Sequence, residues 1–264
     1  MKDLIKKILR EELEEKVIKI PNLHYFGNTE TSDERIEAWN RVLSYVGDRK
    51  FKVQGHLNLG NTTIESLGNL QSVGGSLYLS NTPIESLGNL QSVGGSLYLS
   101  NTPIESLENL QSVGGDLDLY GSLIKSLENL QSVGGNLDLY DTFIESLGNL
   151  QSVGGDLDLT RTPIQSLGNL QSVGGLNLIA TTIQSLGNLQ SVSDDLTLYR
   201  SSIQSLGNLQ SVGGDLDLSY TSVESFGDLK YVGNSLFVTS TPLSKKYSMK
   251  EIEEMVNVGQ RIFM

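Results

Sequence analysis

Carboxylates recur in this sequence at positions where a repeating fold would bring them together. Asp118, Asp138, Asp158 and Asp217 occupy equivalent places in a segment that repeats at a regular interval along the chain. If successive copies stack as neighbouring strands, equivalent side chains lie about 4.8 Å apart, close enough to share a cation or a proton. A calcium ion, however, takes about six or more oxygen ligands. We therefore interpret these aspartates as solvated carboxylates on an exposed face, with a shared surface cation as the alternative.

Other reactive groups are scarce. The chain has no cysteine, which excludes disulfides, thiolate metal sites and a cysteine nucleophile. Its two histidines, His24 and His56, are too few for a histidine-rich metal site. No serine–histidine–aspartate set, phosphate-binding loop or metal triad stands out. We expect no enzymatic activity, no metal site and no cofactor.

Charge and hydropathy exclude further classes of protein. Residues 54–247 carry six basic and 18 acidic side chains, whereas residues 1–53 carry 11 basic and 10 acidic ones. Nucleic-acid binding needs a basic surface, so we expect none by the repeats. No apolar run is long enough to span a membrane. The start, MKDLIKKILREELEEKV, lacks the apolar core and cleavage site of a standard signal peptide, so we do not expect secretion by that route.

A long internal repeat organises the chain. The ten residues SLGNLQSVGG recur verbatim from Ser66, Ser86, Ser146, Ser166 and Ser205. Aligning the copies gives nine units and a partial tenth over residues 54–247. The copies that begin at Ser66 and Ser86 belong to consecutive units and show the spacing between them. The seventh unit, residues 174–192, is one residue shorter than the others and lacks a residue between Gly-Gly and Leu. A fixed period of about 20 residues predicts a solenoid.

Each unit combines a strand with a return segment. In LYLSNT the apolar residues alternate, so Leu77 and Leu79 should point inward and Tyr78 outward. Between Ile84 and Val93 the apolar residues are three apart, a spacing that suits tight turns or a 3₁₀-like coil. We expect one parallel sheet along one face, with the glycine pair supplying backbone angles closed to other residues.

A hydroxyl residue occupies the ninth position of every unit, which predicts a buried column that hydrogen-bonds turn backbone. Asn69, Asn89 and their equivalents are expected to do the same on the other side. The members of the hydroxyl column are Thr62, Thr82, Thr102, Ser122, Thr142, Thr162, Thr181, Ser201, Thr221 and Thr241.

The ends of the chain are predicted to be helical. We expect an amphipathic helix within residues 1–20, a helical N-terminal cap within residues 21–53 and a helical C-terminal cap over residues 248–264. Thr31 and Glu34 have the spacing of a capping box. The first helix has three open roles: packing on the cap, pairing with a second copy, or docking elsewhere. The oligomeric state is therefore left open.

The pattern L-x-L-x-x-T-x-I-x-x-L resembles the leucine-rich repeat, with Thr where that family usually has Asn. The Val-Gly-Gly-x-L-x-L junction is similar to the receptor L-domain branch of the family. The resemblance implies a mainly β fold, a parallel β-solenoid of about nine to ten coils with helical caps. It also implies binding of another macromolecule on the strand face. A branch with ubiquitin-ligase activity acts through a cysteine, which is absent here.

The N-terminal stretch MKDLIKKILREELEEKV resembles the leaders of proteins from phages with contractile tails. Some such leaders are cleaved after a hydrophobic-x-Glu triplet, and residues 9–11 and 13–15 both fit that pattern. This resemblance implies a location in the cytoplasm of a bacterial host or in a phage particle.

Differences between the units predict the binding surface. Gln71 and its equivalents do not change although we expect them to be exposed, whereas residues on and beside the strand vary. Tyrosine and arginine are over-represented at interface hot spots. Recent duplication is the alternative, because the second and third units differ only at Gly88 and Glu108. The predicted partner-binding residues are Tyr78, Tyr98, Asp118, Tyr120, Asp138, Tyr140, Asp158, Arg161, Tyr199, Arg200, Asp217, Tyr220 and Phe237.

These observations favour a non-enzymatic scaffold that binds a protein with a basic surface through an acidic, tyrosine-rich strand face. A phage or particle-associated structural protein, incorporated through its N-terminal helix, is the alternative. An engineered consensus repeat is a third reading, which the shortened seventh unit and the uneven strand face disfavour.

Overall fold

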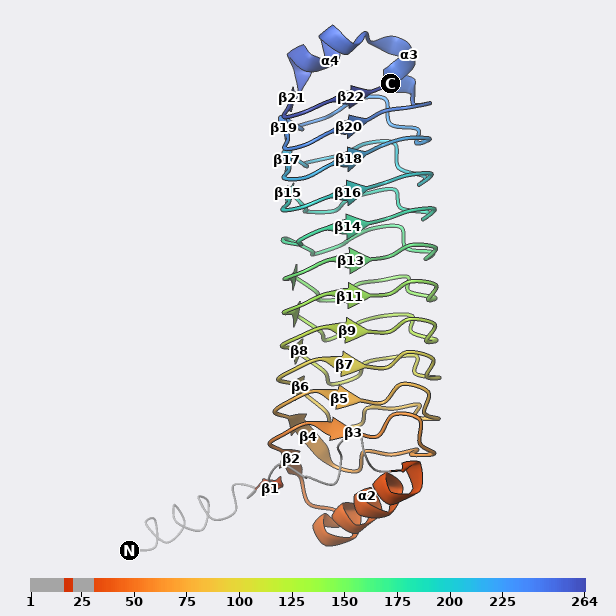
Figure 1. The fold of residues 1–264 in the computed structure, drawn as a ribbon, viewed down its shortest axis with the longest axis vertical. Helices are drawn as coiled ribbons and strands as arrows, with labels where there is room; N and C mark the ends of the chain where they lie inside the picture. The colour runs from red at the N-terminus through yellow and green to blue at the C-terminus, as the bar shows by residue number, and fades with distance from the viewer. Residues whose placement is uncertain (1–16, 21–30) are drawn as a thin grey trace, which may run out of the picture.

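The computed structural model describes residues 17–20 and 31–264. The chain winds into a column of stacked coils, with helix α2 at one end and helices α3 and α4 at the other (Figure 1). The predicted mainly β, parallel solenoid with one coil per repeat unit is confirmed. We number the coils 1 to 10 by the repeat units, which begin at Gln54, Gly74, Gly94, Gly114, Gly134, Gly154, Gly174, Ser193, Gly213 and Gly233.

The first strand of each coil belongs to one continuous sheet of 11 parallel strands, here called the leucine sheet. Equivalent residues pair in register, as Leu77 does with Leu97. Its strands are β3 (Leu57–Asn58), β5 (Leu77–Tyr78), β7 (Leu97–Tyr98), β9 (Leu117–Asp118), β11 (Leu137–Asp138), β13 (Leu157–Asp158), β14 (Leu176–Asn177), β16 (Leu196–Thr197), β18 (Leu216–Asp217), β20 (Leu236–Phe237) and β22 (Ile262–Phe263).

The return segments contain the predicted tight turns, as between the Leu90 N–H and the Leu87 carbonyl at 3.2 Å, but also strands, so the prediction of a single sheet is wrong. Serine and valine of the QSV stretch pair with the same residues of the next coil, and we call the result the valine sheet. One part contains β1 (Ile18–Ile20), β2 (Phe51–Val53), β4 (Leu70–Val73), β6 (Ser92–Val93), β8 (Ser112–Val113), β10 (Ser132–Val133) and β12 (Ser152–Val153). The other contains β15 (Ser191–Val192), β17 (Ser211–Val212), β19 (Tyr231–Val232) and β21 (Asn257–Val258).

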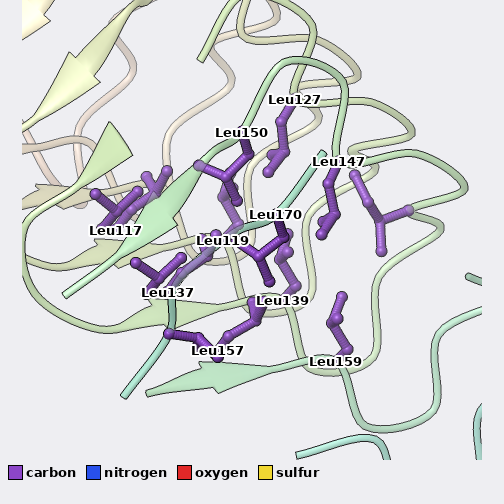
Figure 2. Close-up of a cluster of buried hydrophobic side chains, with 14 of the residues drawn as sticks. Leu117, Leu119, Leu127, Leu137, Leu139, Leu147, Leu150, Leu157, Leu159 and Leu170 are labelled. Carbon is purple, nitrogen blue, oxygen red and sulfur yellow. The ribbon is translucent and has the colours of Figure 1, made fainter. Parts of the chain in front are cut away.

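The core lies between the two sheets and is built from identical side chains. The inward leucines, isoleucines and valines of the repeats are almost completely buried. Figure 2 shows leucines of neighbouring coils gathered inside the column, among them Leu117 with Leu137 and Leu119 with Leu139. Burial of one such side chain contributes about 2 kcal/mol. Because each coil repeats the same packing, the core grows in length without changing in thickness.

Polar ladders satisfy the backbone of the turns. Each of the eight threonines in the hydroxyl column donates to the carbonyl three residues before it, as Thr82 does to Leu79 at 2.7 Å. The predicted role of this column is confirmed for the threonines, although their bonds lie within a coil. It is wrong for Ser122 and Ser201, whose buried hydroxyls make no hydrogen bond. The asparagine amides join neighbouring coils, with Asn89 donating to the side chain of Asn69 at 2.9 Å.

The glycine pair has a different role from the one predicted. Neither Gly94 nor Gly95 has a positive φ; the left-handed residues of coil 2 are Asn81 (φ 56°) and Gly88 (φ 58°). A Cβ on Gly94 would overlap the carbonyl oxygen of Gly74 and lie 3.0 Å from its carbonyl carbon. The first glycine of the pair therefore permits close stacking of the coils and does not supply a special backbone angle.

Coil 7 is shortened at a different place from the one predicted. The Gly174 N–H donates to the Gly155 carbonyl at 2.9 Å, as the second glycine of other pairs does. The residue that is missing is thus the first glycine, between Val173 and Gly174. Here the valine sheet is interrupted after β12, with an isolated bridge to Ser172, whereas the leucine sheet continues through β14.

The N-terminal end is closed by α2 (Ser32–Val46), whose predicted capping box between Thr31 and Glu34 is present. Trp39 is buried and its indole donates to the Ser66 carbonyl at 3.1 Å. The predicted N-terminal helix lies outside the described residues up to residue 16, and Ile18–Ile20 forms strand β1 instead of helix. No helix within the described parts of the chain is long and apolar enough to cross a membrane.

The C-terminal end has two helices, α3 (Pro242–Lys246) and α4 (Met249–Met255). The prediction of a helical cap over residues 248–264 is wrong beyond Met255. Strands β21 and β22 continue both sheets, pairing with β19 and β20. The stretch VGQRIFM therefore repeats VGNSLFV, which spans the junction of coils 9 and 10, and adds half a coil after coil 10.

Candidate binding face

The predicted site residues belong to the strands of the leucine sheet, which Figure 1 shows stacked along the column, and to the turn that follows each strand. We call the outward side of these strands and turns the strand face. In-register pairing places the mid-strand residues in one column, and all of them are exposed or half-buried. In order along the solenoid they are Asn58, Tyr78, Tyr98, Asp118, Asp138, Asp158, Asn177, Thr197, Asp217, Phe237 and Phe263.

Aromatic rings on this face are stacked between coils. Tyr78 and Tyr98 have ring centroids 4.8 Å apart and are inclined by 9°. Tyr120 and Tyr140 are 5.6 Å apart and inclined by 17°. Each ring thus covers part of its neighbour's face, a favourable offset arrangement that fixes the side chains before any partner binds.

Two arginines of the face are held by these rings. The Arg161 guanidinium lies 5.7 Å from the Tyr140 ring and donates to its hydroxyl at 3.0 Å. Arg200 lies over both Tyr199 and Tyr220, at 5.1 and 5.6 Å. The two rings themselves meet edge to face at 5.4 Å. The structure therefore brings together Tyr199, Arg200 and Tyr220, a cluster joined by cation–π contacts.

Three of the predicted residues occupy a strained backbone position. Arg161, Arg200 and Tyr220 have φ values of 60°, 56° and 60°. Coils 1 to 3 have asparagine at this position, the residue other than glycine that tolerates the left-handed region best. A bulky side chain here costs about 1 kcal/mol. The local backbone therefore does not explain the choice of arginine or tyrosine.

The aspartates of the column have a structural role as well. Asp118, Asp138 and Asp217 each accept the backbone N–H two residues later, at 3.0, 2.9 and 2.8 Å. Asn58 makes the same bond to Gly60 at 3.2 Å. One oxygen of each of these carboxylates thus stabilises its own turn, as asparagine can, and only the negative charge distinguishes aspartate from asparagine.

Asp138 lies in the middle of three stacked carboxylates. Partial burial raises the pKa of its carboxyl above the usual aspartate value, and the charges of Asp118 and Asp158 raise it further. The hydrogen bond from the Tyr140 N–H acts in the opposite direction. No set of three or more histidine, aspartate or glutamate side chains in the described residues is arranged to hold a metal ion.

Sequence reasoning missed three exposed residues near this face. Phe263 stacks on Phe237 with ring centroids 4.6 Å apart, and the Val-Gly-x-x-Ile pattern of the last residues was the available signal. Leu123 and Phe143 are exposed at the turn position directly after the buried hydroxyl of coils 4 and 5. The signal there is an apolar residue where coils 8 and 9 have Ser202 and Ser222.

No protein-family model matches the chain, and neither a curated protein nor a solved structure is significantly similar to it. The resemblance to leucine-rich repeats thus stands on the repeat pattern and the coil geometry, which concern the fold and not the partner.

Proposed function

We propose that this chain is a non-enzymatic, leucine-rich-repeat-like scaffold that binds another protein through the strand face. The observation that carries the proposal is the placement of Arg161, Arg200 and Tyr220 in left-handed backbone. Selection for stability alone would favour asparagine or glycine at a strained position, because these residues relieve the strain. Large side chains that persist there and contact neighbouring tyrosines are better explained by a binding role.

The charge of the face indicates the partner. Asp118 and Asp138 alternate with Tyr120 and Tyr140 in coils 4 and 5, and Asp158 follows in coil 6. The two arginines of the face, Arg161 and Arg200, are already engaged with tyrosine rings. A partner with lysine or arginine on its surface would be attracted by the carboxylates and by exposed ring edges and hydroxyls. A location in a phage particle or bacterial cytoplasm remains a second proposal, which depends on residues outside the described part of the chain.

The test uses substitutions that other coils already contain. The strand-face variant carries Tyr98→Thr, Asp118→Asn, Asp138→Asn and Tyr140→Ser, which match Thr197, Asn177, Asn58 and Ser219 at the same positions. The control variant changes the exposed Gln91, Gln111, Gln131 and Gln151 to Asn. Both variants should fold, since the core is untouched.

Wild type and both variants are compared by quantitative pull-down from a lysate of the source organism. We expect a protein that wild type and the control variant retain and that the strand-face variant loses. If the strand-face variant retains the same set of proteins as wild type, or if wild type retains none, the proposed function fails.

A further inference from the structure

An exposed apolar ridge crosses the turn of coils 4 and 5. It consists of Tyr120, Leu123, Tyr140 and Phe143, of which Tyr120, Leu123 and Phe143 have exposed fractions of 43%, 40% and 57%. At the position of the two tyrosines, coils 2, 3 and 9 have Ser80, Ser100 and Ser219, and at the position of Leu123 and Phe143, coils 8 and 9 have Ser202 and Ser222. Two adjacent coils thus concentrate large apolar side chains where several other coils have small polar ones.

The register of the coils places these side chains beside one another. The Tyr120 and Tyr140 rings are stacked, and the Glu145 N–H donates to the Lys125 carbonyl at 2.9 Å. Leu123 lies between Tyr120 and Lys125, and Phe143 lies between Tyr140 and Glu145. Leu123 and Phe143 therefore occupy equivalent positions of neighbouring coils. The next coil on each side has Pro103 or Pro163 at the turn position, which lengthens the apolar surface along the solenoid axis.

A partner at this ridge must be recognised through side chains. Strands β9 and β11 are paired on both sides, with the Leu117 N–H donating to Asn136 and the Leu119 N–H donating to Asp138, at 2.8 and 2.9 Å. No sheet edge is therefore free at these coils for an added strand.

The spacing of the coils fits an α-helix that lies along the solenoid axis. Equivalent residues of parallel coils recur about every 4.8 Å, or about 9.6 Å over two coils. Residues i and i+7 of a helix are separated by about 10.5 Å, with i+3 or i+4 between them. In an extended strand, the side chains on one side are about 6.6 Å apart. This spacing does not match the spacing of the coils, so alternate side chains of the strand would not meet a coil.

The charges beside the ridge complete the argument. Asp118, Asp138 and Asp141 flank it, and the cations near it are engaged: Lys125 pairs with Glu105 at 2.7 Å and Arg161 with Tyr140. We propose that the ridge is the binding hot spot and that its occupant is an amphipathic helix of a protein partner. Apolar residues at i, i+3 or i+4 and i+7 of that helix pack on the ridge, and lysine or arginine beside them faces the aspartates.

This inference rests on the proposed function and is tested with a probe that needs no known partner. A library of random 16-residue peptides displayed on phage is selected on the immobilised full chain. Selected peptides are synthesised, and their dissociation constants are measured for wild type and for a ridge variant with Leu123→Ser and Phe143→Ser. These serines match Ser202 and Ser222, and neither change alters a residue of the strand-face variant. The variant with Gln91, Gln111, Gln131 and Gln151 changed to Asn, which lies outside the strand face, is the control here as well.

We expect selected peptides with apolar residues at helical spacing and an excess of lysine and arginine, which become helical on binding by circular dichroism. The ridge variant should bind them about tenfold or more weakly, since truncating a hot-spot residue has an effect of this order. The control variant should bind them as wild type does.

Three results would overturn the inference: no enrichment, enriched peptides with a proline-rich or alternating pattern, or equal affinity for wild type and the ridge variant. The proposed function is judged separately. If the natural partner is lost by the strand-face variant and retained by the ridge variant, the function stands and this inference fails.

Discussion

At the scale of single residues, the left-handed position of each coil separates what the backbone prefers from what the chain contains. Asn61, Asn81 and Asn101 suit this conformation, whereas Ala180 and Arg200 do not. Ala180 gains nothing in return, because its methyl group makes no polar contact. Arg200 gains contacts with two tyrosine rings. The two residues therefore form a natural comparison.

Ala180→Asn is predicted to raise the free energy of unfolding by up to about 1 kcal/mol, because asparagine tolerates a positive φ better than alanine. Arg200→Asn should gain less, since it relieves the same strain and loses the cation–π contacts, which contribute about 0.5–1 kcal/mol at exposed sites. Urea unfolding of both variants checks this. A larger gain for Arg200→Asn than for Ala180→Asn would show that the tyrosine contacts do not stabilise the fold.

Asp138 gives the strand face a pH dependence. Its pKa is raised in the folded protein by burial and by Asp118 and Asp158, so its folded state binds protons more tightly than its unfolded state. Its contribution is most favourable below the unfolded pKa and is lost as the pH rises through the folded pKa. Asp138→Asn keeps the acceptor for the Tyr140 N–H and removes the charge.

Asp138→Asn should therefore stabilise the protein at neutral pH and have little benefit near pH 3. The stability difference between variant and wild type, measured by urea unfolding across that range, isolates this group from the other carboxylates. Asp217→Asn is the matched control, because Thr197 and Phe237 flank it in place of two carboxylates. An equal pH dependence for both variants would contradict the explanation.

At the scale of the coil, the fixed repeat period was sufficient to predict the solenoid, the inward leucines and the buried hydroxyls. The second sheet was not predictable from that period, because the serine–valine strands are very short and have no alternation to detect. The role of the glycine pair was misjudged for a related reason. Close approach between coils and an unusual φ both require glycine, so the sequence alone does not distinguish the two.

Gly114→Ala should destabilise the protein by about 1–3 kcal/mol, the usual range for overpacking. Its added Cβ would overlap the Gly94 carbonyl oxygen and push two coils apart. Ser193→Ala should be nearly neutral, since Ser193 stacks on the coil that lacks the corresponding residue. Thermal unfolding compares the two. A neutral Gly114→Ala variant would mean that the coils separate at little cost.

The candidate site, like the fold, was predictable from the sequence only in part. The tyrosine and aspartate columns were predictable because any period places equivalent residues side by side. The arginine–tyrosine contacts and the ridge at Leu123 and Phe143 were not, since they depend on how the turn orients its side chains.

At the scale of the whole molecule, one coil divides an otherwise uniform column. The leucine sheet runs through coil 7, but the valine sheet stops after β12 and starts again at β15. Cooperativity in a solenoid depends on the interface between adjacent repeats. The interface between coils 6 and 7 lacks valine-sheet pairing, because Ser172 forms only an isolated bridge to Ser152 of coil 5, and it is the place where the column should separate into two units.

Hydrogen exchange followed by mass spectrometry should show residues 174–264 opening as one unit, at a lower free energy than coils 2 to 6. Inserting a glycine between Val173 and Gly174 together with Ser193→Gly should restore the valine sheet and remove this difference. The insertion without Ser193→Gly should not, because the serine side chain then meets the new carbonyl. Uniform protection along the wild-type column would contradict this division.

The shortened coil also records an order of events. Serine at position 193 would collide with a full-length coil 7, so the loss of one residue there had to precede or accompany it. Once the serine was present, regaining the lost residue became harmful. The serine is tolerated only with the shortened coil, whereas the shortened coil does not need the serine. Such a one-way dependence acts as a ratchet, because the lost residue cannot return without cost while the serine remains.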